Sequence, residues 1–179
     1  MADDVPDLAS QVEQNRGIIK KIQLYIPGFR AYRTGDDLRV ADALLRKQVS
    51  ENLNIAMNNL RLARTTLAQQ GDFQVLSIIG NCLSGLQQLD GEILHSAQGY
   101  TGISPAVRID ESKLKDLYQY DFNFIETSDE ICKQSDPSFL ATGDVNSLVE
   151  RIQSMQNLIN STRINWEKRL ESVQKILIR

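Results

Sequence analysis

A run of 35 residues, Asp36 to Gln70, contains neither glycine nor proline, the two residues that most disfavour a helix interior. Its apolar side chains recur at gaps of three and four residues, which matches the α-helical turn of roughly 3.6 residues. They are Leu38, Ala41, Leu45, Val49, Leu53, Ala56, Leu60, Ala63 and Leu67. A helix of this length measures about 50 Å. Because several partners are needed to cover its apolar stripe, the rest of the chain is expected to be helical.

The remaining sequence predicts four more amphipathic helices, at 6–26, 73–97, 111–133 and 145–178. Turn-forming residues separate the segments, among them Pro27, Gly28, Gly71, Asp72, Gly99, Gly102, Pro105 and Pro137. We therefore expect an all-α fold, an antiparallel up-down bundle of five helices in a single domain over 1–179. The two long helices are 36–70 and 145–178. The first helix is expected to pack beside the start of the 36–70 helix.

The composition is that of an ordinary globular chain, with 179 residues of which 41% are hydrophobic and 24% charged. No apolar stretch approaches the length of about 18 residues that a membrane span requires. The first residues are acidic and lack the pattern of a signal peptide, which favours a cytoplasmic protein. Cys82 and Cys132 are far apart and are expected to be free thiols in the interior.

The net charge of −3 is distributed unevenly along the chain. Residues 15–65 carry ten bases and four acids, whereas residues 66–147 carry twelve acids and four bases. Such blocks form solvated faces, or pair with each other within the fold or across an oligomer. We expect self-association, because Val40, Leu44 and Ile55 lie off the main apolar stripe of the long helix and leave apolar surface exposed.

The only histidine, His95, follows Glu92 at the E-x-x-H spacing found in di-iron bundles. Such a site needs a second histidine, so we expect neither a metal nor a cofactor. Every scheme of nucleophilic catalysis with a histidine base would also have to use His95. The helix at 73–97 contains Gly80, Gly85 and Gly91, which are expected to let a neighbouring helix approach closely.

Asp121 lies at the edge of the apolar stripe of the 111–133 helix, where a carboxylate needs a partner. An arginine of the 36–70 helix is the expected partner. A polar pocket around Asp121 would favour an alternative function, either catalysis or the binding of a small ligand.

A basic region runs from the first turn into the long helix, and aromatic residues lie within it. Its charged members are Arg30, Arg33, Arg39, Arg46, Lys47, Arg61 and Arg64. Nucleic-acid binding is not expected, because the whole chain is acidic and lacks a reading helix or a stacking sheet. Binding of an anionic polymer or a membrane surface by this basic face remains an alternative.

Two stretches of the sequence resemble a family of small helical prokaryotic proteins of unknown function. The first is Ile26-Pro27-Gly28-Phe29-Arg30-Ala31-Tyr32-Arg33 with the following Leu38-Arg39-x-x-Asp42-x-Leu44-Leu45-Arg46. The second is Gly99-Tyr100-Thr101-Gly102 with Leu117-Tyr118-Gln119-Tyr120-Asp121. The resemblance covers about a quarter of the chain and departs at Arg33-Thr34-Gly35-Asp36, where the family pattern has a Lys-x-Lys-Glu run. It implies a helical, cytoplasmic, prokaryotic protein and brings no activity, substrate or cofactor.

We expect a non-enzymatic helical scaffold or protein-interaction module. Alternating helix directions would place the turns at 27–35 and 98–110 at the same end of the bundle. Aromatic and arginine side chains, which are enriched at binding hot spots, are concentrated in these two turns. The candidate interaction residues are Phe29, Arg30, Tyr32, Arg33, Tyr100 and Arg108. The alternative is that the second turn only covers core side chains.

Overall fold

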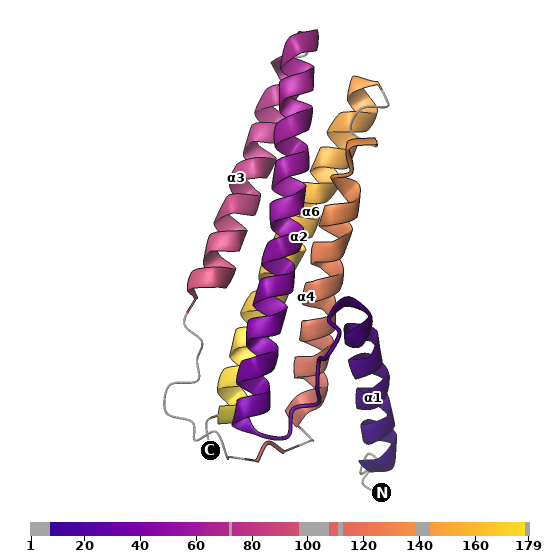
Figure 1. The fold of residues 1–179 in the computed structure, drawn as a ribbon, viewed down its shortest axis with the longest axis vertical. Helices are drawn as coiled ribbons and strands as arrows, with labels where there is room; N and C mark the ends of the chain where they lie inside the picture. Colours follow the sequence, from indigo (N-terminus) through magenta and orange to yellow (C-terminus); the bar gives the residue numbers. More distant parts are fainter. Residues whose placement is uncertain (1–7, 72, 97–107, 111–112, 139–143, 178–179) are drawn as a thin grey trace, which may run out of the picture. The chain divides into compact units, whose positions relative to one another are not determined.

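A computed structural model of the chain describes residues 8–71, 73–96, 108–110, 113–138 and 144–177 (Figure 1). Within these ranges the fold is all-α, which confirms the predicted class. The helices are α1 (Leu8–Tyr25), α2 (Gly35–Gln70), α3 (Phe73–His95), α4 (Leu114–Gln134) and α6 (Val145–Leu177). Over the described residues, none of these helices combines the length and the apolarity that crossing a membrane requires.

The helix ends follow from local hydrogen bonds. The backbone N–H of Thr34 donates to Asp37 Oδ2 at 2.9 Å, and the N–H of Asp37 donates back to Thr34 Oγ1 at 3.3 Å, so the two side chains cap the start of α2 reciprocally. Gly71 ends α2 with a φ of +86°, a conformation that other residues rarely adopt. The carboxylate of Asp144 caps α6 by accepting a hydrogen bond from Ser147 N–H at 2.8 Å. The predicted starts at Pro6 and Glu111 lie outside the described residues.

The chain divides into two compact units. The first contains residues 1–45, 98–125 and 165–179, and the second contains residues 46–97 and 126–164. The helices α2, α4 and α6 each contribute one segment to each unit, whereas α1 belongs only to the first and α3 only to the second.

In the first unit, the predicted short turn after α1 is an extended return segment. The backbone N–H of Tyr32 donates to the hydroxyl of Tyr118 on α4 at 2.8 Å, and the amide of Gln23 donates to Phe29 O at 2.8 Å. Figure 1 shows the chain leaving the end of α1 and returning to the level at which α1 began before α2 starts. The prediction that α1 is antiparallel to α2 is therefore wrong. The cause is that Phe29 and Tyr32 are buried, which holds the segment extended along the core.

The ring contacts of α1 are also with α4 rather than with α2. The Tyr25 ring lies 6.4 Å from the Phe122 ring, and the ammonium of Lys21 lies 5.4 Å from the centre of the same ring. The predicted packing of the first helix beside the start of the long helix is corrected accordingly.

In the second unit, pairs of polar side chains fix the register between helices. The amides of Asn52 and Asn59 on α2 donate to the hydroxyls of Ser128 and Ser135 on α4, at 3.0 and 3.2 Å. Both pairs advance by seven residues in the same order, so these segments of α2 and α4 run in the same direction.

The predicted apolar stripes form the core, with one difference on α4. Along α2, Leu38, Leu45, Val49, Leu53 and Leu60 are fully buried. On α4, the apolar side chain of Phe122 is only half-buried, and Phe124 lies in the core instead. Its ring stacks on Trp166 of α6 at 5.1 Å. Cys82 is a buried free thiol as predicted, whereas Cys132 is partly exposed.

Truncation of the buried stripes in the second unit should destabilise the fold. Leu53→Ala on α2 and Ile152→Ala on α6 each remove a fully buried side chain and should lower the free energy of unfolding by about 2–5 kcal/mol. Leu62→Ala, on the exposed side of α2, is the matched control and should have little effect. Denaturant titration measures all three. Equal small effects would show that the stripes are wrongly assigned.

Candidate functional site

A cluster of buried polar side chains lies inside the first unit, built around Arg169. Its Nε donates to Asp121 Oδ1 at 2.6 Å, and its Nη1 donates to Asp42 Oδ1 at 2.6 Å. The hydroxyl of Tyr32 donates to the other oxygen of Asp121. The cluster therefore joins the return segment, α2, α4 and α6, with its members at most 2% exposed.

Aromatic rings shield this cluster from solvent. The rings of Tyr32 and Tyr118 are stacked 4.9 Å apart with an interplanar angle of 12°, and Phe29 packs edge-on against Tyr32 at 5.6 Å. The guanidinium of Arg169 lies 5.5 Å from the Trp166 ring. An arginine within about 6 Å of a tryptophan ring is attracted by the ring electrons.

Burial dominates the electrostatics of the cluster. It raises the pKa of Asp121 above its ordinary value, an effect that the positive charge of Arg169 partly opposes. Burial, together with the nearby carboxylate of Asp121, holds the pKa of Tyr32 well above its ordinary value. Tyr32 therefore remains a protonated hydrogen-bond donor.

The arrangement suits a structural role, because its hydrogen bonds join the helices to one another. Both oxygens of Asp121 are engaged, one by Arg169 and one by Tyr32, so a ligand would have to displace a buried partner to reach it. The predicted partner of Asp121, an arginine of the long second helix, is wrong, because the arginine comes from α6. The reason is the register between α4 and α6, in which Phe124 meets Trp166 one turn away from the ion pair.

Sequence reasoning missed two members of this cluster, Asp42 and Arg169. Arg169 continues the three- and four-residue spacing of Thr162, Trp166 and Val173, all of which are buried. A charged residue on a buried stripe is the signal that could have identified it. The neighbouring Leu170 also fits a three- and four-residue spacing between Trp166 and Val173, but it is only half-buried.

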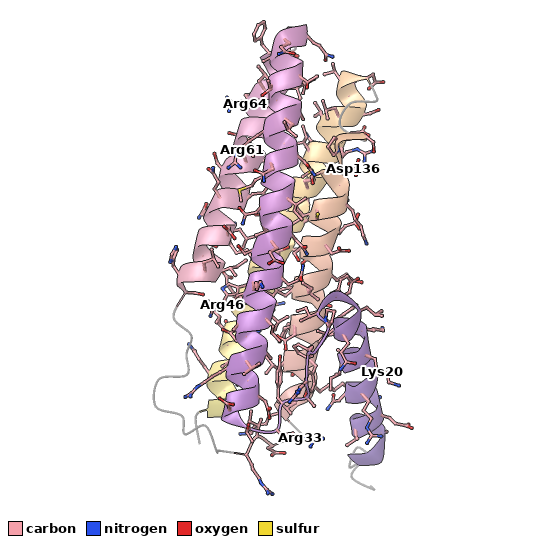
Figure 2. All side chains as sticks on the ribbon, viewed as in Figure 1. Lys20, Arg33, Arg46, Arg61, Arg64 and Asp136 are labelled. Carbon is pink, nitrogen blue, oxygen red and sulfur yellow. The ribbon has the colours of Figure 1, made fainter. Side chains whose placement is uncertain are left out.

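The structure separates the six candidate interaction residues. Arg30, Arg33 and Arg108 are exposed, and Figure 2 shows Arg33 pointing away from the helices. Phe29 and Tyr32 are buried, so they belong to the core and not to a surface. Tyr100 lies outside the described residues.

The two predicted turns do meet. Thr34 forms an isolated antiparallel bridge with Arg108, and the N–H of Ile109 donates to Arg33 O at 3.1 Å. The expectation that residues 27–35 and the end of the 98–110 segment lie together is therefore confirmed. This contact fixes the segment that leads into α4 against the start of α2.

Other residues that the sequence singled out lie in the second unit, where most of them contact other parts of the protein. Glu92 pairs with Arg163 at 2.8 Å, and His95 is exposed in the last turn of α3. Arg46 bonds to the carbonyl oxygens of Ile93 and Ser96, and so caps the C-terminal end of α3. Within the described part of the chain, no three histidine, cysteine or acidic side chains gather in a way that could hold a metal ion.

A polar cavity of about 760 Å³ lies between the end of α4 and the start of α6, in the second unit. Its lining includes charged and hydroxyl side chains, namely Glu130, Lys133, Gln134, Ser147, Glu150, Arg151 and Ser154. The cavity is distinct from Asp121, which belongs to the first unit. The predicted polar pocket around Asp121 is thus replaced by the filled cluster described above.

The outward face of α3 is free of charge. From Phe73 to Leu89 the helix carries no Asp, Glu, Lys, Arg or His. A stripe at alternating gaps of four and three residues runs along this face, opposite the buried side. It consists of Phe73, Ser77, Gly80, Ser84, Gln87, Gly91 and Leu94. Phe73 is 71% exposed and Leu94 is 48% exposed, so large apolar side chains mark both ends.

The glycines of α3 differ in their surroundings. A methyl group at Gly85 would lie 3.8 Å from Ile159 of α6, which confirms the expected close approach there. At Gly80 and Gly91, no described atom lies within 4 Å of such a methyl group. The expectation of a neighbouring helix is therefore wrong for these two glycines, because they face outward.

A segment of α6 beside α3 is also free of charge. Because Ile159 faces Gly85, this part of α6 lies beside α3. Residues 152–162 of α6 contain no charged side chain, and Gln153, Asn157 and Asn160 are exposed. Uncharged amide side chains are therefore exposed on α6 as well as on α3 in the second unit.

Comparison of the chain with protein-family models, with curated proteins and with solved structures gave no match.

Loss of the Tyr32 hydroxyl should destabilise the first unit. Tyr32→Phe keeps the stacked ring but leaves one buried oxygen of Asp121 without this donor, which should cost about 1–3 kcal/mol of unfolding free energy. Tyr120→Phe on α4, where the side chain is half-buried, is the control and should cost much less. Thermal and denaturant unfolding compare the two variants. Equal costs would contradict the structural role of the Tyr32–Asp121 contact.

The stability of the first unit should also depend on pH through Asp121. Since its pKa is raised by burial, the folded state holds this proton more tightly than the unfolded state. This contribution is complete below the ordinary aspartate pKa and is lost as the pH rises through the folded pKa. Asp121→Asn should therefore cost more stability at about pH 4 than at about pH 7. A cost that grows towards neutral pH in denaturant titrations would contradict the direction of the shift.

Proposed function

We propose that this protein is a non-enzymatic helical interaction module that binds another α-helix on the outward face of α3. The observation that carries the proposal is the presence of Gly80 and Gly91 at positions where neither the backbone conformation nor the packing of the described residues requires glycine. Neither glycine has a positive φ, so the backbone does not require them. Neither has a described neighbour within 4 Å of the missing methyl group.

The cost of these glycines supports an external partner. Each glycine in a helix interior costs about 1 kcal/mol relative to alanine. A small residue on an outward face allows the backbone of a second helix to approach closely, and the packing gained there offsets the cost. Ser77 and Ser84, which are also small, lie on the same stripe as Gly80.

The chemistry of the face also fits an interface. Interface cores are depleted of charged residues and enriched in aromatic and apolar anchors. The α3 stripe has no charge over its first 17 residues in a chain that is 24% charged. Phe73 and Leu94 provide exposed apolar anchors at its two ends.

The buried cluster supports binding rather than catalysis as the proposed role. The carboxyl group most suited to acid–base work by its raised pKa, Asp121, is engaged on both oxygens by Arg169 and Tyr32. A group engaged in this way contributes to the fold and does not need a substrate to satisfy it.

Photo-crosslinking in the source cells tests the proposal. A benzophenone side chain placed at Ser84, on the α3 stripe, should give a discrete protein adduct. The same side chain at Asn58, exposed on α2 of the same unit, is the matched control and should not. Gly80→Leu in the Ser84 variant should remove the adduct while preserving the helical circular dichroism spectrum. Identical adduct patterns from both sites would contradict a docking face on α3.

A further inference from the structure

We infer that the helix bound by this face belongs to a second copy of the same chain, packed antiparallel, α3 against α3. The inference rests on the proposed docking face and names its occupant. It follows from three properties of the second unit: the chemistry of the face, the order of its side chains, and the charges at its edge.

The chemistry of the face is self-complementary. In a symmetric dimer the same patch is used on both subunits, so each group meets a copy of itself or of a neighbour. Hydroxyl and amide side chains both donate and accept hydrogen bonds, so Ser84 can pair with its own copy and Gln87 with a polar group of the facing helix. Ionised groups in these positions would meet like charges. The net charge of −3 opposes association of two copies elsewhere, and this face avoids that repulsion.

The order of side chains along α3 favours the antiparallel arrangement. The stripe from Phe73 to Leu94 measures about 32 Å and is centred near Ser84. A two-fold axis at Ser84 places Phe73 of one copy beside Leu94 of the other at both ends of the contact. The small residues at 77, 80, 84 and 91 then lie between these anchors and allow close contact of the two backbones.

Charged side chains beside the stripe also favour the antiparallel arrangement. Arg64 lies 18 residues, or about five helical turns, after Arg46, whose guanidinium bonds the end of α3, so both arise on the α3 side of α2. Figure 2 shows Arg64 on this side of α2, near the first half of α3. Asp90 lies near the other end of α3. An antiparallel pair brings Arg64 of one copy towards Asp90 of the other, because the two-fold axis keeps both residues on the same edge of the contact.

Association of the purified full-length chain is the first test. Sedimentation equilibrium should show a dimer, and Gly80→Ala should raise its dissociation constant roughly tenfold, because a methyl group is added where the backbones meet. In the separated subunits the same substitution should increase stability, since the new methyl group meets no described atom within 4 Å. Gly17→Ala on α1 is the matched control, because its methyl group also meets open space. It should increase stability without changing the dissociation constant.

Disulfide mapping tests the direction of the pair, in a Cys132→Ser background with the buried Cys82 left in place. Ser84→Cys should form a covalent dimer with itself. A mixture of the Phe73→Cys and Leu94→Cys proteins should form the mixed disulfide in preference to either symmetric one. Preferential Phe73→Cys homodimers would overturn the antiparallel arrangement.

The outcomes separate this inference from the proposed function. A wild-type chain that sediments as a monomer at high concentration would overturn self-pairing. If Ser84 nevertheless gave an adduct with a different protein in cells, the docking face would stand with another occupant. If Ser84 gave none, both proposals would fail.

Discussion

The ion pairs of Arg169 are the constraint on which the first unit depends. A guanidinium that is fully buried loses its hydration, and only well-placed partners offset that loss. Arg169 finds Asp42 on α2 and Asp121 on α4, so three helices must hold their register for the charge to be neutralised. Apolar packing alone tolerates small shifts along a helix, but these two contacts at 2.6 Å do not. The cluster therefore specifies one alignment of helices that are otherwise similar amphipathic rods.

The course of the chain after α1 follows from the same cluster. Tyr32 reaches Asp121 with its hydroxyl, stacks on Tyr118 with its ring, and donates to the hydroxyl of Tyr118 with its backbone. These contacts draw the return segment into the interior and prevent a tight turn between α1 and α2. A residue that is read from the sequence as part of an aromatic surface is thus a core residue with a polar end, as is common for buried tyrosine.

The sequence predicted what depends on local spacing and missed what depends on distant pairing. Helix α2 was predicted to within one residue at its start, because 35 residues without a breaker leave few alternatives. Asp121 was recognised as needing a partner, but the partner lies 48 residues away and on a different helix from the one expected. The partner could not be chosen from periodicity, since the spacing of each helix says nothing about its rotation against another. For the same reason, the sequence located the glycines of α3 on a helix but could not assign each one to the inward or the outward side.

The two units differ in where they place charged side chains. In the first unit, charged side chains lie in the interior, where each is matched by an opposite charge or a hydroxyl group. In the second unit, the outward face of α3 lacks the charged residues that usually make up about a quarter to a third of a soluble surface. The buried carboxylates of Asp42 and Asp121 are paired with Arg169 inside the chain. The charge-free helix face has no corresponding neighbour at two of its glycines, because a methyl group added at Gly80 or Gly91 would meet no described atom within 4 Å. A face that lacks both charge and an internal neighbour is stabilised when another helix covers it, which is why the uncharged amides and hydroxyls of α3 argue for association rather than for solvent exposure.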